Sequence, residues 1–202
     1  FNDIVLENWK ESDIWTDSLW IINERDKSGK HSNFYHGNFV PQIPHQLILR
    51  YSKENDLVFD PFLGSGTTAY ECETLKRNFI YIKIKSKLAE KVQNNLNKTE
   101  KISKVFWRDS TKKGTFEEIN IFLKDKKQNK VQLAILHPPY ADIVKFSSLE
   151  NDLSNKKSLK EFLESFSLVL QNTKAIMKKD GYLAIVIGDK YSSGKWIPLG
   201  FY

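Results

Sequence analysis

The sequence predicts an α/β fold in which a mostly parallel sheet carries helices on both faces. Five short runs rich in branched and aromatic residues recur along the chain, at residues 57–60, 78–84, 104–109, 132–137 and 182–189. Longer polar stretches separate these runs, and several of the stretches have the spacing of amphipathic helices. Strands that alternate with helices in this way are typical of a parallel sheet.

Three segments are predicted to be helices, at residues 67–74, 86–96 and 158–179. The first should begin directly after a glycine-rich turn. The third carries the strongest signals, because the capping box Ser158-x-x-Glu161 precedes an apolar stripe at helical spacing. Its expected end holds Lys178 and Lys179, where positive charge suits the negative end of the helix dipole.

Composition limits the possible classes of function. The chain has 202 residues, which suffices for one domain with a sizeable core, and its net charge of +6 permits a polyanionic partner without requiring one. Cys72 is the only cysteine, so we expect no disulfide framework, no cysteine metal site and a reducing, cytoplasmic setting. No apolar run approaches the ~20 residues of a membrane helix, so we expect no membrane partner.

The stretch Asp60–Thr68, DPFLGSGTT, has the form of a cofactor loop between a strand and a helix. Its glycines suit unusual backbone angles and close approach of a ligand to the main chain. Two other interpretations stay open at this point. The stretch Gly64–Ala69 also fits the dinucleotide pattern G-x-G-x-x-A, in which Lys83 would meet a 2′-phosphate of a nicotinamide cofactor. It also fits a tight loop that binds nothing.

Taken whole, DPFLGSGTT resembles the cofactor signature of the amino-group DNA methyltransferases, which methylate adenine N6 or cytosine N4 with S-adenosylmethionine. The segment His36–Ser52, which contains Phe39, resembles the family segment that closes over the methionine end of the cofactor. The resemblance implies a Rossmann-like methyltransferase fold in which Asp60 receives the cofactor's amino group. The cofactor-binding residues that it implies are Phe39, Asp60, Pro61, Phe62, Gly64, Ser65, Gly66, Thr67, Thr68, Lys83 and Asp109.

A second motif, His137-Pro138-Pro139-Tyr140, follows the fourth apolar run, at the end of a strand where active residues of parallel sheets gather. The prolines have fixed φ and no N–H, so a proline carbonyl is held stiffly. Amino methylation needs such acceptors to orient the nitrogen lone pair, and an aromatic ring to stack on a flipped base. The family pattern begins with Asp, Asn or Ser. His137 still offers a ring nitrogen as acceptor but does not indicate the target base.

Lys83 departs from the family pattern. The resemblance places it where an acid accepts hydrogen bonds from both ribose hydroxyls, and it places Tyr81 where a small residue is usual. Lysine has donors and no acceptor, so a loss of about 1.5–3 kcal/mol in cofactor binding is expected. Three alternatives follow: a weak cofactor binder, an altered and catalytically impaired copy, or a non-catalytic DNA-holding partner of an active subunit.

The resemblance also sets expectations for domains and partners. Residues 1–35 are predicted to form an arm packed on the core, and residues 36–202 an incomplete catalytic domain that lacks its last strands. Only about 70 residues separate the two motifs, which leaves no room there for a target-recognition domain, so we expect that domain to be absent. The implied partners are double-stranded DNA and, as an open alternative, a separate specificity or partner subunit. A nicotinamide enzyme explains neither DPF nor HPPY, and an RNA amino methyltransferase stays open.

Overall fold

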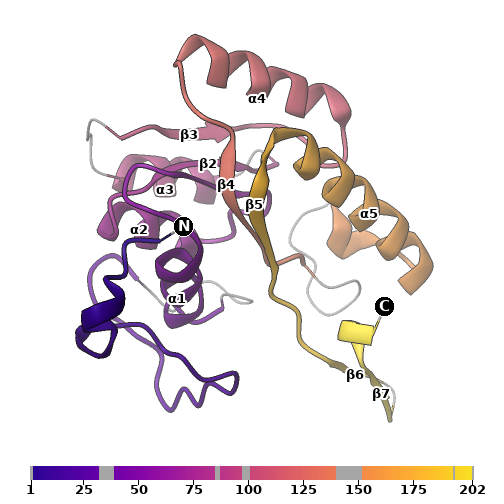
Figure 1. Ribbon diagram of the computed structural model, residues 1–202. Helices are drawn as coiled ribbons and strands as arrows, with labels where there is room; N and C mark the ends of the chain where they lie inside the picture. The colour runs from indigo at the N-terminus through magenta and orange to yellow at the C-terminus, as the bar shows by residue number, and fades with distance from the viewer. Residues whose placement is uncertain are drawn as a thin grey trace.

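The computed structural model describes residues 2–31, 39–84, 87–96, 101–139, 152–192 and 194–201. Its main sheet has five strands in the order β3-β2-β1-β4-β5, and all neighbouring strands are parallel (Figure 1). Their bounds are β1 (Leu57–Asp60), β2 (Asn78–Ile82), β3 (Ser103–Phe106), β4 (Val131–Leu136) and β5 (Met177–Ile185). This is the strand order of a doubly wound, Rossmann-like sheet, so the predicted fold class is confirmed.

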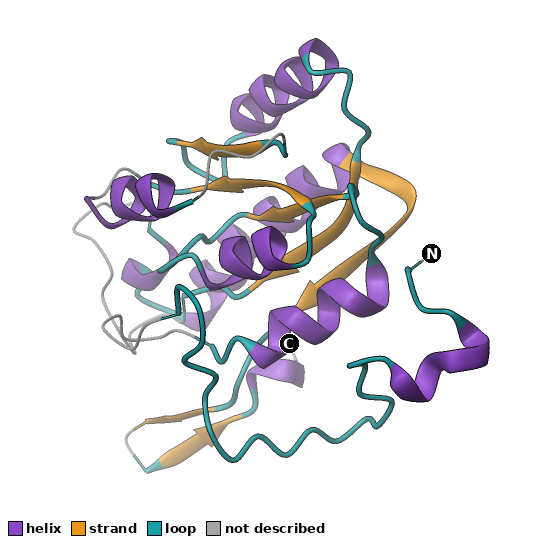
Figure 2. Cartoon of the chain, turned by 90° about the vertical axis from the view of Figure 1, so that its left-hand side faces the viewer, coloured by secondary structure: helices purple, strands orange, loops and turns teal. Residues whose placement is uncertain are grey.

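Helices cover both faces of the sheet (Figure 2). One face packs against α1 (Gln42–Tyr51), α2 (Thr67–Thr74) and α3 (Lys87–Asn95), and the other against α4 (Lys113–Asp125) and α5 (Leu159–Ile176). The predicted helices at 67–74 and 86–96 are therefore present, the first with the predicted bounds. Short 3-10 helices lie at Leu6–Glu11, Leu153–Asn155 and Leu199–Phe201.

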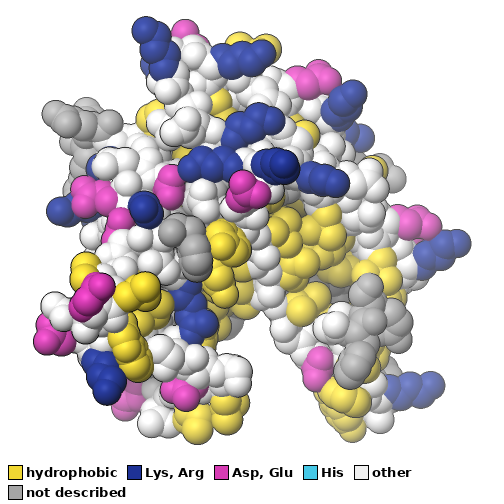
Figure 3. All heavy atoms as spheres, in the orientation of Figure 1, with side chains coloured by type: hydrophobic (Ala, Val, Ile, Leu, Met, Phe, Trp, Pro, Cys, Tyr) yellow, Lys and Arg dark blue, Asp and Glu magenta, His cyan; other side chains and the backbone are white. Residues whose placement is uncertain are grey.

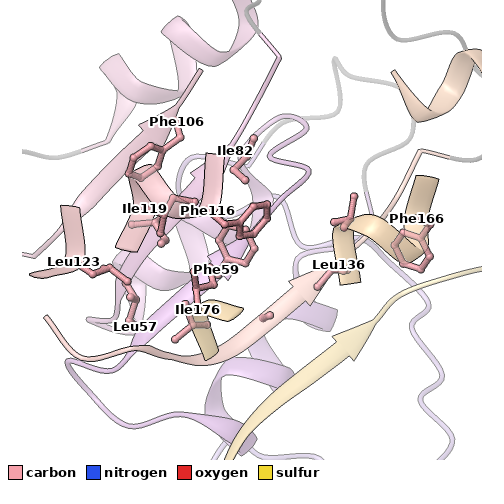
Figure 4. Close-up of a cluster of buried hydrophobic side chains, with 14 of the residues drawn as sticks. Leu57, Phe59, Ile82, Phe106, Phe116, Ile119, Leu123, Leu136, Phe166 and Ile176 are labelled. Atoms are coloured by element: carbon pink, nitrogen blue, oxygen red, sulfur yellow. The ribbon is translucent and has the colours of Figure 1, made fainter. Parts of the chain in front are cut away.

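Alternating side chains of each strand supply the two cores. In β1, Leu57 and Phe59 face the α4 and α5 side, whereas Val58 faces α1 and α2. The Phe59 ring meets the ring of Phe116 from α4 edge to face, with centroids 5.8 Å apart (Figure 4). All four residues of β1 are buried, as expected for a central strand of a sheet that is covered on both faces.

The helix predicted at residues 158–179 ends three residues early. Ser158 caps it as expected, because its Oγ accepts the backbone N–H of Glu161, but the last helical residue is Ile176. Met177 already pairs with Val131 as the first residue of β5. Lys178 therefore lies in the strand, where its Nζ forms an ion pair with Asp56 at 2.9 Å.

The early start of β5 depends on an irregular register. Between Val131 and Leu133 of β4, the partner strand advances from Met177 to Tyr182, so β5 bulges. Gly181 lies in this bulge, and a Cβ there would come within 3.1 Å of the carbonyl oxygens of Val131 and Gln132. A larger residue would not fit without moving backbone.

Two further segments flank the sheet. The N-terminal residues contact α1 and its surroundings: Asn2 donates to the Arg50 carbonyl, and Asp3 pairs with Arg77 at 2.8 Å. After β5, the antiparallel strands β6 (Lys190–Ser192) and β7 (Lys195–Ile197) form a hairpin apart from the main sheet. Within the described ranges, no helix is both long and apolar enough to cross a membrane.

Candidate cofactor and amino-group site

The register of the parallel strands brings the predicted site residues to one edge of the sheet. Asp60 of β1 is level with Tyr81 of β2, and Ile82 is level with Phe106 of β3. On the other side of β1, Phe59 pairs with Ala134 of β4, so β4 ends at the same edge. Four of the predicted site residues lie at these strand ends or shortly after them. In spatial order across the sheet they are Asp109, Lys83, Asp60 and His137.

The glycine loop has the backbone that its sequence predicts. Gly64 and Gly66 have φ angles of 53° and 89°, which lie in the left-handed region. The N–H of Gly66 donates to the Leu63 carbonyl, and α2 begins at Thr67. Pro61, Ser65, Thr67 and Thr68 are buried in this loop and the first turn of α2.

Asp60 is a buried carboxylate at the start of this loop, with only 4% of its surface exposed. Its Oδ1 accepts the backbone N–H of Phe62 at 2.8 Å, while the Phe62 ring packs towards Phe166 of α5. Burial raises the pKa of Asp60 to about 6, although the Phe62 N–H, the nearby Thr68 hydroxyl and the charge of Lys83 act in the opposite direction. A buried carboxylate of this kind favours a cationic ligand.

Lys83 lies directly beyond β2, and its backbone N–H donates to the Phe106 carbonyl. Burial lowers the pKa of its ammonium, and the carboxylates of Asp152 and Asp60 oppose that shift. Asp152 is itself buried and caps the short helix Leu153–Asn155 by accepting the N–H of Ser154. The lysine thus balances two carboxylates at the site edge. Sequence reasoning missed Asp152, which no motif marks.

The sequence predicts a strand that runs to Asp109, but in the structure Asp109 lies beyond the end of β3. β3 ends at Phe106, because the Arg108 N–H turns back to donate to the Phe106 carbonyl. Asp109 lies in the turn before α4, where its Oδ1 accepts from the backbone N–H and hydroxyl of Thr111. Its Oδ2 is buried and, among the residues that the structure describes, has no hydrogen-bond partner. An amino group of a ligand would satisfy it.

His137 follows the last residue of β4. Its ring lies 4.7 Å from the ring of Phe39, between centroids, so the segment before α1 contacts the His-Pro-Pro motif. Burial lowers the pKa of His137 to about 4, which leaves the imidazole neutral at neutral pH and able to accept a hydrogen bond. Pro138 is buried beside it. Tyr140, the predicted stacking residue, lies outside the described residues.

The family model described as DNA methylase, for amino-group methyltransferases, matches residues 3–94. Over these residues the chain is similar to the amino-group DNA methyltransferases. The matched region includes the whole glycine loop, the Phe39 segment and Lys83, so the resemblance predicted from DPFLGSGTT is confirmed.

Individual relatives agree. The Type II methyltransferase M.HinfI of Haemophilus influenzae is 35% identical over 104 residues, which are 46% of this chain and 28% of the relative. M2.LlaDCHI of Lactococcus lactis subsp. cremoris is 37% identical over 86 residues, 43% of this chain and 30% of the relative. M.BglI of Bacillus subtilis is 28% identical over 137 residues, 67% of this chain and 35% of the relative. The chain thus spans about a third of the length of each.

Proposed function

We propose that this chain binds S-adenosylmethionine and transfers its methyl group to the exocyclic amino group of adenine (N6) or cytosine (N4) in double-stranded DNA. The observation that carries the proposal is the adjacency of β1 and β4. It brings the first residues of the two motifs, Asp60 and His137, to the same edge of the sheet. The molecule is hollowed at this edge, between the N-terminal residues and the β6–β7 hairpin (Figure 3). The relatives M.HinfI and M2.LlaDCHI are Type II methyltransferases, which supports the same reaction class.

Two carboxylates, those of Asp60 and Asp109, suit the two amino groups of this cofactor. The Asp60 carboxylate, buried with a raised pKa, suits the amino group of the methionine moiety. Asp109 Oδ2, which has no hydrogen-bond partner within the described part of the chain, suits the amino group of the adenine moiety. When bound, S-adenosylmethionine supplies an electrophilic methyl group on a sulfonium sulfur.

His137 and Pro138 would orient the nucleophile. The amino nitrogen of a base is a weak nucleophile, because its lone pair is delocalised into the ring. A neutral His137 nitrogen and the Pro138 carbonyl each accept one of its hydrogens, which directs the lone pair at the methyl carbon. The proton that the amino nitrogen gives up on methylation would pass to solvent, because His137, whose pKa is lowered to about 4, orients the amino group as a hydrogen-bond acceptor and does not retain a proton at neutral pH. Tyr140 would stack on the flipped base.

Two substitutions at position 137 test this role. His137→Leu removes the acceptor and should lower methyl transfer by on the order of 100-fold or more, while S-adenosylmethionine affinity stays within about three-fold. His137→Asn keeps an acceptor and should retain transfer. The measurement is radiolabelled methyl incorporation into unmodified DNA, with nucleoside mass spectrometry to identify the base and RNA as a parallel substrate. Full activity of His137→Leu would refute the role.

A second candidate function, a catalytically impaired homologue, rests on Lys83. A cation at this position, beside Asp60 and Asp152, gives no acceptor to ribose hydroxyls. We expect calorimetric titration to show S-adenosylmethionine binding to Lys83→Glu about 10- to 100-fold more tightly than to the natural chain. Without ligand, the same variant should melt at a lower temperature, because it places a third carboxylate at the edge.

The variant Lys83→Met separates the two effects, because it removes the cation without adding an acceptor. It should gain little affinity. Equal affinity of all three chains would show that position 83 does not contact the ribose. Binding by Lys83→Glu alone would favour the impaired homologue.

A further inference from the structure

A network of four ionisable side chains lies outside the site described above. Glu71 of α2 is buried, and its two oxygens face two histidines: His31 Nε2 at 2.5 Å and His45 Nδ1 at 2.7 Å. The other nitrogen of His45 lies 3.0 Å from Asp13. Carboxylates only accept hydrogen bonds, so an imidazole that faces one on each nitrogen donates from both and carries a positive charge.

The network joins the N-terminal residues to two helices. His45 belongs to α1 and Glu71 to α2, whereas Asp13 and His31 belong to the segment before α1. The same segment is fastened nearby by polar contacts of α1 and α2: Gln46 with Trp15 and Asp13, Gln42 with Asp26 and Glu24, and Glu73 with Lys30. The charged groups facing the histidines are therefore Glu71, Asp13 and Asp26, with the Lys30–Glu73 pair one step further out.

Both ends of this connection reach the site. The helix that carries Glu71 begins at Thr67, directly after Gly66, the last glycine of the loop. On the other side, Arg25 of the N-terminal segment donates from Nη1 to the Phe39 carbonyl at 2.9 Å, and the Phe39 ring rests on His137. A displacement of the N-terminal segment would therefore shift Phe39 and change its contact with His137 of the His-Pro-Pro motif.

We propose that His31, Glu71 and His45 are positioning residues, which hold the N-terminal segment on α1 and α2 and so keep Phe39 against His137. The inference rests on the proposed function, since it makes the segment before α1 a working part of the methyl-transfer site. The ion pairs are buried on the Glu71 side, with 6% of the side chain exposed for both Glu71 and His31, so removal of one partner leaves an uncompensated charge.

The pKa shifts of His45 and Glu71 predict that the attachment of the N-terminal segment depends on pH. The hydrogen bond to Glu71 raises the pKa of His45, although burial opposes it. Burial alone would raise the pKa of Glu71, but the hydrogen bonds from the two histidines outweigh it and the pKa is lowered. The His45 contribution to stability is therefore present below about pH 6.5 and lost as the pH rises through its raised pKa. The Glu71 contribution is lost only at acid pH.

The test compares Glu71→Gln with a control, Glu118→Gln. The control breaks the exposed ion pair between Arg108 and Glu118 of α4, a helix on the opposite face of the sheet. Without cofactor or DNA, hydrogen exchange of residues 13–31, corrected for intrinsic rates, should be about ten-fold faster in Glu71→Gln and unchanged in the control. In the natural chain, exchange of this segment should accelerate as the pH rises above about 6.5 and through the raised pKa of His45, and Glu71→Gln should lose that pH dependence.

The NMR resonance of the His137 ring gives a readout that does not need activity, because the adjacent Phe39 ring shifts it. His137→Asn assigns the signal, and we expect Glu71→Gln to move it. His31→Asn, which removes one of the two histidines that face Glu71, gives the same test if Glu71→Gln does not fold. Unchanged exchange or an unmoved His137 signal would overturn the inference. If the natural chain transfers methyl groups, kcat should fall with little change in the KM for cofactor; if it does not, the exchange and NMR results still decide.

Discussion

Gly66→Ala is expected to destabilise the fold by about 2–5 kcal/mol, the largest stability loss that we predict for a single methyl group. Two costs add. Gly66 has φ = 89°, where an L-residue pays about 1–2 kcal/mol. Its new Cβ would also lie 2.6 Å from Val92 Cγ1 of α3, and this overlap forces a shift that costs about 1–3 kcal/mol. Denaturant unfolding followed by circular dichroism measures the sum.

A double-mutant cycle separates these costs. Val92→Ala removes the colliding methyl groups and by itself leaves a cavity, because Val92 is only 1% exposed. The double variant Gly66→Ala/Val92→Ala should therefore be more stable than additivity predicts, by about 1–3 kcal/mol. Gly114→Ala on α4 is the matched control, since its Cβ meets nothing within 4 Å, and it should be neutral or slightly stabilising. Strict additivity would mean that α3 does not pack on the loop as described.

The elements that the sequence predicts well are those with local chemistry of their own. The buried run Leu57–Asp60 and the helix at 67–74 have the predicted bounds, because an apolar strand, left-handed glycines and a helix start follow each other without a gap. The lysine-rich region 98–130 gave a weaker signal. The helix α4 lies within it and buries Phe116 and Ile119.

Other features depend on contacts that no local pattern encodes. The helix α5 was predicted to continue to Lys179, but pairing of Met177 with Val131 outweighs helix propensity, and the bulge needs Gly181 beside the carbonyls of β4. α1 was not predicted as a helix, although its one proline, Pro44, lies in the first turn, where proline is tolerated.

The candidate site divides in the same way. Asp60 and His137 are predicted as site residues because each lies at the end of a strand, inside a specific motif. Asp152 and the Glu71 network are not, because their roles arise from residues far apart in the chain that the fold brings together. Motif spacing indicates candidate ligand-binding residues, but it does not indicate residues that distant parts of the chain bring beside them.

Asp60→Asn is expected to stabilise the protein at neutral pH while it weakens cofactor binding. Burial raises the pKa of Asp60 to about 6, so ionisation of this carboxyl opposes folding. Stability is fully present below the ordinary pKa of an aspartate and is lost as the pH rises through the folded pKa. At about 1.4 kcal/mol per pKa unit, the cost above about pH 7 is on the order of 3 kcal/mol, and asparagine avoids it. Its Oδ1 can still accept the Phe62 N–H.

The difference in unfolding free energy between Asp60→Asn and the natural chain should therefore be near zero at about pH 4 and reach about 2–3 kcal/mol at about pH 8. Thermal and urea denaturation at several pH values measure it. Calorimetry should show S-adenosylmethionine affinity of Asp60→Asn reduced by about ten-fold or more, because a carboxylate that pairs with an ammonium is replaced by a neutral amide.

The matched control is Asp56→Asn, at the opposite end of β1, where the carboxylate pairs with Lys178 and is far from the glycine loop. It should lose a little stability, because the ion pair with Lys178 is broken, and bind the cofactor unchanged. The raised pKa would be contradicted if the unfolding free energy of the natural chain, relative to that of Asp60→Asn, did not fall between about pH 4 and pH 7. An Asp60→Asn chain that is stabilised and still binds the cofactor fully would place the methionine amino group elsewhere. The two results together distinguish a carboxylate that is buried for binding from one that is buried for structure, because only the former costs stability when the site is empty and recovers it when a cation binds.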